Sequence, residues 1–167
     1  MTDFHLAQMN VARLRAPLDD PSIAGFAAGL DLMNALADRS PGFVWRMTEE
    51  DVDGFPAPDR GDPAVIATMS VWESLEHLRA YVYQSAHLDY LRQRRDWFVP
   101  GGSSLVLWWV EAGHIPGVPE GLERLRRVTT EGPGPEAFTF RKPFPAPGPG
   151  ATRPRGERPE PLPARPA

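Results

Sequence analysis

Alternating apolar and polar positions divide the first 47 residues into a strand, a helix and a second strand. Residues 5–14 alternate, so that Leu6, Gln8 and Asn10 share one face of the predicted strand. Asp20 and Pro21 then stand at the positions of a helix N-cap and a first helical residue, and an apolar stripe follows at helical spacing. The residues SPG at 40–42 end this helix, and residues 43–47 (FVWRM) predict a short strand.

The rest of the chain repeats these signals. The predicted elements are a strand over 64–72, a helical pattern over 73–98 with a candidate break near Ser85, a strand over 105–110, a helix over 119–132 and a short extended segment over 136–141. The strand LVLWWV at 105–110 is apolar on both faces, which is typical of a strand covered on both sides. Trp108 and Trp109 must therefore point to opposite faces.

This element order predicts an α+β fold of the ferredoxin-like type. The pattern is βαββαβ, with an antiparallel four-stranded sheet, helices on one face and an extra C-terminal helix. The strands are apolar on both faces, and the pattern provides no second set of helices. We therefore expect a homodimer in which the uncovered sheet faces meet, as in a dimeric α/β barrel.

Composition places the domain at residues 1–142 and a tail at 143–167. The tail is rich in Pro, Ala, Gly and Arg and has almost nothing apolar to bury, so we expect it to be disordered with polyproline II character. A solvated tail is the favoured interpretation, and a ligand for a proline-binding module is the alternative.

Charge and residue usage narrow the function classes. The chain has no cysteine and a net charge of -4, which excludes disulfides and thiolate metal sites and gives no electrostatic case for nucleic acid. No apolar run approaches the roughly 18 residues of a membrane span, and no secretion signal is evident. We therefore expect a soluble cytoplasmic protein that binds neither membrane nor nucleic acid. No phosphate loop, dinucleotide fingerprint or metal-ligand spacing occurs, so no metal site is expected.

His87 is the first candidate for chemistry. A continuous helix over 73–98 would place a mixed set on one face, with Tyr90 beside it: Tyr83, His87, Leu91, Arg94 and Phe98. Apolar positions with a few polar groups among them are typical of a pocket wall. The alternative is that His87 caps or packs the start of a helix. Arg92 and Arg95 are expected to lie in solvent.

Three further residues are candidates for binding. Gln8 and Asn10 lie on an otherwise apolar strand face, where a side-chain amide needs a partner from the backbone or from a ligand. His114 follows the last central strand in a turn with Gly and Pro, from which it could reach the mouth of a pocket. A turn histidine bonded to backbone is the alternative.

The passage SVWESLEHLRAYVYQSAH at 70–87 resembles the antibiotic-biosynthesis-monooxygenase-like, dimeric α/β-barrel superfamily. Segments such as HLAQMNVARL, SPGFVWRM and LVLWWVEAGHIP are similar to those of a bacterial family of unknown function, over roughly residues 4–146. The resemblance implies a pocket between the sheet and its helices, with Trp72 in its wall and Tyr81 or Tyr83 in place of a helix tryptophan. It also implies roles for Asn10 on the first strand and His87 on the helix, although His87 precedes the haem-ligating position of haem-degrading members by about one turn.

These observations predict a small-molecule enzyme without a cofactor. We expect a monooxygenase or a related proton-transfer enzyme that acts on a hydrophobic, aromatic metabolite. His87 would be the base, Asn10 and Arg94 would stabilise the anion, and the substrate would contact the remaining candidates, Gln8, Trp72, Tyr83, Tyr90 and His114. The alternatives are a haem-binding or haem-degrading protein and a non-catalytic ligand-binding or interaction module.

Overall fold

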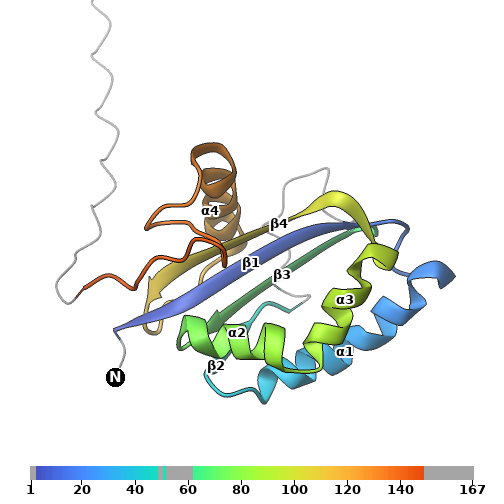
Figure 1. Cartoon of the computed structure of the whole chain (residues 1–167), viewed down its shortest axis with the longest axis horizontal. Coiled ribbons are helices and arrows are strands. Elements are labelled where there is room, and N and C mark those ends of the chain that lie inside the picture. Colours follow the sequence, from blue (N-terminus) through green and yellow to red (C-terminus); the bar gives the residue numbers. More distant parts are fainter. Residues whose placement is uncertain (1–2, 49–50, 52–61, 149–167) are drawn as a thin grey trace, which may run out of the picture.

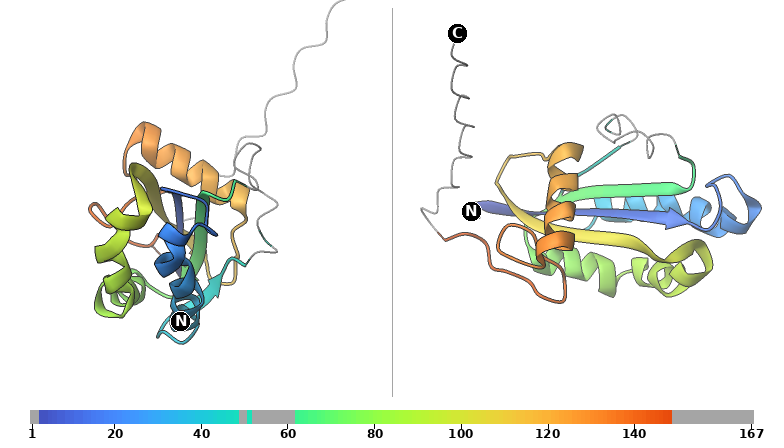
Figure 2. Two further views of the ribbon diagram at one scale, coloured as in Figure 1. Left: turned by 90° about the vertical axis from the view of Figure 1, so that its right-hand side faces the viewer. Right: turned by 90° about the horizontal axis from the view of Figure 1, so that it is seen from above.

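A four-stranded antiparallel sheet separates three helices on one face from one helix on the other (Figures 1 and 2). The computed structural model describes residues 3–48, 51 and 62–148. The strands are β1 (Phe4–Leu14), β2 (Phe43–Arg46), β3 (Val65–Trp72) and β4 (Phe98–Glu111). The helices are α1 (Ala24–Asp38), α2 (Leu75–Gln84), α3 (His87–Trp97) and α4 (Val118–Glu131), and a 3-10 turn (Pro21–Ile23) precedes α1. The strand order β2-β3-β1-β4 confirms the predicted ferredoxin-like fold.

The central strand β1 pairs with β3 on one side and β4 on the other, and its side chains alternate as predicted. Leu6 and Leu14 face α1, α2 and α3, whereas Ala7 and Met9 face α4. On β4, Trp108 belongs to the apolar cluster under α4 and Trp109 packs against the cluster on the opposite face. The prediction that these tryptophans point to opposite faces is therefore confirmed.

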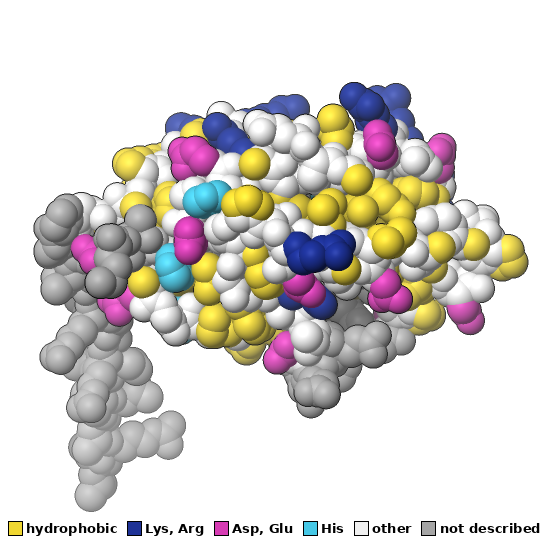
Figure 3. All heavy atoms as spheres, turned by 90° about the horizontal axis from the view of Figure 1, so that it is seen from below, with side chains coloured by type: hydrophobic (Ala, Val, Ile, Leu, Met, Phe, Trp, Pro, Cys, Tyr) yellow, Lys and Arg dark blue, Asp and Glu magenta, His cyan; other side chains and the backbone are white. Residues whose placement is uncertain are grey.

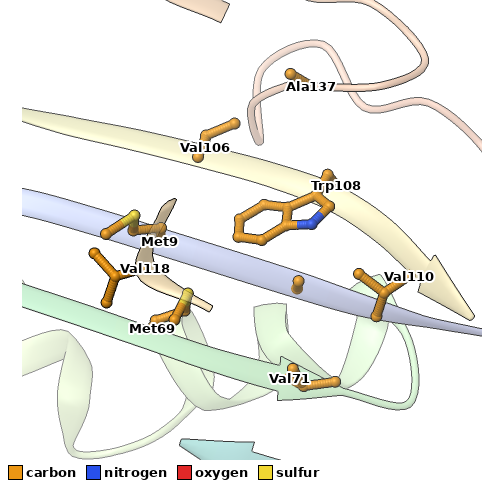
Figure 4. Close-up of a cluster of buried hydrophobic side chains, with 9 residues drawn as sticks. Met9, Met69, Val71, Val106, Trp108, Val110, Val118 and Ala137 are labelled. Atoms are coloured by element: carbon orange, nitrogen blue, oxygen red, sulfur yellow. The ribbon is translucent and has the colours of Figure 1, made fainter. Parts of the chain in front are cut away.

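Helix α4 packs directly on the second face of the sheet. A Cβ atom on Gly121 would lie only 2.5 Å from the Met9 sulfur, so glycine allows the close approach of helix to sheet. Figure 4 shows the cluster beneath, with Met9 on β1, Met69 on β3 and the indole of Trp108 on β4. The sequence predicted the C-terminal helix and no second set of helices, but it did not assign that helix to this face, and homodimerisation stays a prediction.

The predicted helix over 73–98 is two helices. Ser85 is extended (φ -120°, ψ -179°) and accepts a hydrogen bond from the His87 backbone N–H at 3.1 Å, which ends α2 and begins α3. Tyr83 and His87 therefore do not share a helix face, and Phe98 is already the first residue of β4. The long β4 also includes residues 98–104, which pattern alone did not identify as strand.

The segment after α4 returns to the edge of β4. Phe138 forms an antiparallel bridge with Leu107, and the Trp109 indole donates a hydrogen bond to the Phe144 carbonyl at 2.9 Å. Phe144 lies within the predicted tail, and residues 149–167 lie outside the described part of the chain. None of the described helices is both long and apolar enough to cross a membrane.

Candidate functional site

Two apolar clusters lie between the sheet and helices α1 to α3. One is centred on Leu6 and Trp72 and the other on Leu14 and Trp97. Between them the sheet presents four polar residues from its two central strands. We call this set the polar tier: Gln8, Asn10, Thr68 and Ser70. Gln8 is directly opposite Ser70, and Asn10 is directly opposite Thr68. The side chains of opposite residues on one face of a sheet are neighbours, so the tier is a continuous polar patch.

Hydrogen bonds join one end of the polar tier to the aromatic cluster beside it. The Gln8 amide donates to the Ser70 hydroxyl at 3.1 Å, and the Trp72 indole N–H donates to the same oxygen at 2.9 Å. Gln8 and Ser70 are 9% and 8% exposed, whereas Asn10 is half-buried and Thr68 is exposed. Solvent therefore reaches the tier from the Asn10–Thr68 end.

Tyr81 connects Trp72 to the candidate histidine. Its ring stacks on Trp72 with centroids 5.1 Å apart and an interplanar angle of 26°. Its hydroxyl donates to the Met33 carbonyl of α1 at 3.1 Å, and burial raises its pKa to about 12. Tyr81 is therefore a neutral, fixed wall of the site. The resemblance implied Tyr81 or Tyr83 at this position, and Tyr81 is the one that stacks on Trp72.

His87 lies at the junction of α2 and α3, against the other edge of Tyr81. The two ring centroids are 4.9 Å apart, and His87 Nδ1 lies 3.3 Å from the Val82 carbonyl oxygen. A carbonyl can only accept, so this contact places the proton on Nδ1 and leaves a lone pair on Nε2. Nε2 has no hydrogen-bond partner among the described residues. Burial lowers the His87 pKa below its ordinary value of 6.5, and the Val82 hydrogen bond only partly opposes this shift.

Arg46 is a polar neighbour of the tier that the sequence did not single out. It lies on β2 directly opposite Ser70, and its guanidinium donates to both carboxylate oxygens of Asp38, at 2.7 and 3.2 Å. The charge of Arg46 favours the ionised form of Tyr81, but burial dominates there. Cross-strand register was the signal that could have identified Arg46 and Ser70, and that register depends on the pairing of distant segments.

Three residues were predicted to lie with His87 on or beside one face of a continuous helix over 73–98. The structure places them differently. Tyr83 belongs to α2, is 46% exposed and packs edge-on against Phe140. Tyr90 packs between α3 and α1, against Trp97 and the backbone of Gly29. Arg94 does share the His87 face of α3, but it lies about 10 Å further along the axis and is exposed. Figure 3 shows the surface over these helices, where exposed apolar side chains lie among charged ones.

His114 lies on the opposite side of the sheet. Its Nε2 is 2.7 Å from one carboxylate oxygen of Glu120 in α4, and the other oxygen accepts from the Trp108 indole at 3.0 Å. Trp108 belongs to the cluster under α4, so the sheet separates His114 from His87. The structure therefore does not bring His114 beside His87, and its contact with the substrate stays a prediction.

Two surface cavities lie away from the polar tier. One, of about 430 Å³, lies between α2 and the C-terminal segment and is lined by residues such as Arg79, Trp109 and Phe144. The other, of about 260 Å³, lies at the end of α4 around Arg127 and Glu136. Within the described ranges, no three His, Cys, Asp or Glu side chains gather in a way that could hold a metal ion.

Residues 5–153 match the family described as "Domain of unknown function (DUF3291)". The chain belongs to this family. No curated protein matches the DUF3291 chain.

Solved structures show a distant likeness to the DUF3291 chain. SnoaB from Streptomyces nogalater, a cofactor-independent oxygenase, is 17% identical with a TM-score of 0.43, and the match covers 70% of this chain and 98% of SnoaB. NE2512, a protein of unknown function from Nitrosomonas europaea, is 14% identical with a TM-score of 0.43, and the match covers 69% of this chain and 97% of NE2512. These similarities are too low to carry an argument about residues or activity.

Proposed function

We propose that the protein is a small-molecule enzyme in which His87 removes a proton from an acidic O–H or C–H group of an aromatic metabolite. One observation carries the proposal: the hydrogen bond of Nδ1 to the Val82 carbonyl leaves Nε2 of His87 as a free base. The lowered pKa keeps that base neutral at neutral pH.

The surroundings of His87 favour an aromatic substrate. Tyr81, which is half-buried beside His87, provides a flat apolar surface that the fully buried Trp72 backs, and the polar tier lies on the sheet beside them. Asn10 shares the face of the tier and keeps its predicted role of stabilising the anion. Arg94 can stabilise the anion only at the solvent-exposed edge of the candidate site, because it is exposed and about two helical turns from His87.

Oxygenation without a cofactor is the reaction that this arrangement supports best. His87 takes a proton from the substrate, and the electron-rich anion reacts with dioxygen as co-substrate. For a ring CH₂ group, one oxygen atom forms the product carbonyl, the second leaves as water, and both hydrogens end in that water. The protein residues bind the ring, accept the proton at Nε2 and return it.

Haem is a poor fit to the same residues. A haem iron would take Nε2 of His87, and the Nδ1 bond to Val82 resembles the support that such ligands receive. However, Tyr81 already occupies one side of the imidazole at 4.9 Å, and both described cavities lie elsewhere.

The experiment is a turnover screen of hydroxylated aromatic compounds, with dioxygen uptake and product formation as readouts. His87→Gln should abolish turnover of any compound that the wild type converts. His77→Gln is the matched control, because the Nδ1 atom of His77 lies 2.9 Å from the Ser74 hydroxyl at the start of α2. Unchanged turnover in His87→Gln would refute the mechanism.

The double variant His87→Gln/Arg94→Gln separates an enzyme from a non-catalytic ligand-binding module. An enzyme should lose rate in this variant. A binding module should show only a change in affinity.

A further inference from the structure

The Ser70 hydroxyl accepts two hydrogen bonds, which determines where its own proton can point. The Gln8 amide and the Trp72 indole both donate to this oxygen, at 3.1 and 2.9 Å. A hydroxyl has two lone pairs and one O–H donor, so both acceptor positions are filled. The described residues provide no acceptor for the remaining O–H.

Turning the Gln8 amide around does not use up the free donors of the pair. With the amide reversed, Ser70 would donate to Gln8 Oε1, and both N–H bonds of the amide would then be left over. In either orientation the indole of Trp72 can only donate, so the network ends in an unused N–H or O–H group. Lone pairs of Gln8 Oε1 stay unfilled in both orientations, but the Gln8–Ser70 pair always keeps at least one N–H or O–H donor that the described residues do not use.

The position of the pair is suited to a ligand. Gln8 and Ser70 lie in the polar tier beside the stacked rings of Trp72 and Tyr81, and the neighbouring pair of Asn10 and Thr68 is open to solvent. The Asn10 side chain has no hydrogen bond among the described residues.

A cation on the neighbouring strand also suits an anion. Arg46, opposite Ser70 on β2, is a cation whose charge Asp38 partly offsets. Buried donors with a cation in the next strand favour a negatively charged oxygen over a neutral or cationic group.

We propose that Ser70 and Gln8 bind the phenolate or enolate oxygen of the substrate. This inference rests on the proposed function, and it assigns the anion-binding role to the sheet in addition to Asn10 and in place of the exposed Arg94. It names the substrate class as aromatic compounds with an ionisable hydroxyl group. Trp72 then has two roles, since its buried ring stacks on Tyr81 and its N–H donates to the Ser70 hydroxyl.

The test is a binding experiment with 4-nitrophenol, held at a pH where it is ionised, and with its methyl ether, 4-nitroanisole. Calorimetric titration of the full chain should give tighter binding of the phenolate than of the ether. Ser70→Ala and Gln8→Glu should each weaken phenolate binding by about 10- to 100-fold and leave ether binding within about twofold. Ser104→Ala, an exposed serine of β4, is the matched control and should change neither.

Two results would overturn the inference. One is a wild type that does not bind the phenolate more tightly than the ether. The other is a pair of folded variants in which both ligands weaken equally or not at all. Gln8→Glu preserves side-chain size, so it decides the question if Ser70→Ala does not fold.

The binding experiment can fail while the proposed function holds, and the reverse is also possible. Binding tests the Gln8–Ser70 pair without turnover, whereas the His87→Gln assay tests the base.

Discussion

The imidazole of His87 and the phenol ring of Tyr81 lie 4.9 Å apart, tilted by 46°, across the junction between α2 and α3. This contact excludes water from one side of the imidazole, and desolvation is the larger cause of the lowered His87 pKa. A chain of contacts then runs from His87 through Tyr81 and Trp72 to Ser70. The candidate base is thus connected to the sheet through aromatic side chains.

The pH dependence of stability should reveal His87. Its folded-state pKa lies below 6.5, so in the interval below that value the unfolded chain binds the proton more readily than the folded chain. Stability should therefore be complete above pH 6.5 and fall as the pH drops toward the folded-state pKa. An NMR titration of the His87 ring protons should give a midpoint below 6.5.

Replacing the titrating group provides the control. The difference in Tm between wild type and His87→Gln should change with pH only in the acid interval, and it should be constant above pH 6.5. A His87 midpoint at or above 6.5 would contradict the desolvated position seen here.

Ser85 should matter for His87 as well as for helix stability. Its hydroxyl donates to the Tyr81 carbonyl and accepts from the His87 backbone N–H, so it fixes the α2–α3 junction. Ser85→Ala should cost about 0.5–2 kcal/mol of unfolding free energy, as expected for a lost helix cap. It should also move the His87 titration midpoint up toward 6.5, because the loosened junction admits water.

A second helix cap allows the two effects of Ser85 to be separated. Ser74 is the N-cap of α2 and, like Ser85, accepts from a nearby backbone N–H, that of His77 at 3.2 Å. Ser74→Ala should lower Tm by a similar amount and leave the His87 midpoint where it is in the wild type. Equal midpoints in both variants would mean that Ser85 acts only as a cap.

The sequence predicted the strands of the sheet, and the face on which each side chain lies, because both depend on local alternation of apolar and polar residues. Gln8 and Asn10 were assigned to one face before any pairing was known, and Asp20 was correctly placed as an N-cap, accepting from Ser22 at 2.9 Å. The break at Ser85 was also indicated by the sequence. The helical stripe that joined Tyr83 to His87 was wrong because one extended residue rotates everything after it.

The contributions of Ser70 and Arg46 could not be predicted in the same way. Ser70 becomes important only when β1 pairs with β3 in a register that places it opposite Gln8. The position of His114 likewise depends on which face α4 covers, and periodicity cannot determine that. Local pattern therefore provides the elements, while the site requires the pairing of segments about 60 residues apart.

The contact between α1 and α3 should depend on Gly29. A Cβ atom at this position would lie 2.0 Å from the Tyr90 ring, so Gly29→Ala forces the ring or the helix to move. We expect a loss of about 1–3 kcal/mol in urea unfolding. Gly25→Ala, one turn earlier in α1, is the control, because its Cβ would meet Trp97 at 3.4 Å, an ordinary contact.

The Gly25 control should be neutral or slightly stabilising, since alanine favours a helix over glycine by up to about 1 kcal/mol. Truncating Tyr90 to leucine should remove most of the cost of Gly29→Ala. If Gly29→Ala were as stable as Gly25→Ala, the close packing of Tyr90 on α1 would be incorrect.

Glu120 should stabilise the α4 side of the sheet without affecting the polar tier. Its carboxylate accepts from the fully buried Trp108 indole and lies beside His114. Glu120→Ala leaves the indole N–H without this acceptor and should cost about 1–3 kcal/mol of unfolding free energy. Glu123→Ala, which removes an exposed ion pair with Arg126 on the same helix, should cost much less. In both variants 4-nitrophenolate binding should match the wild type, because the sheet lies between Glu120 and Ser70. A loss of binding in Glu120→Ala alone, with the fold intact, would show that the two faces of the sheet are coupled.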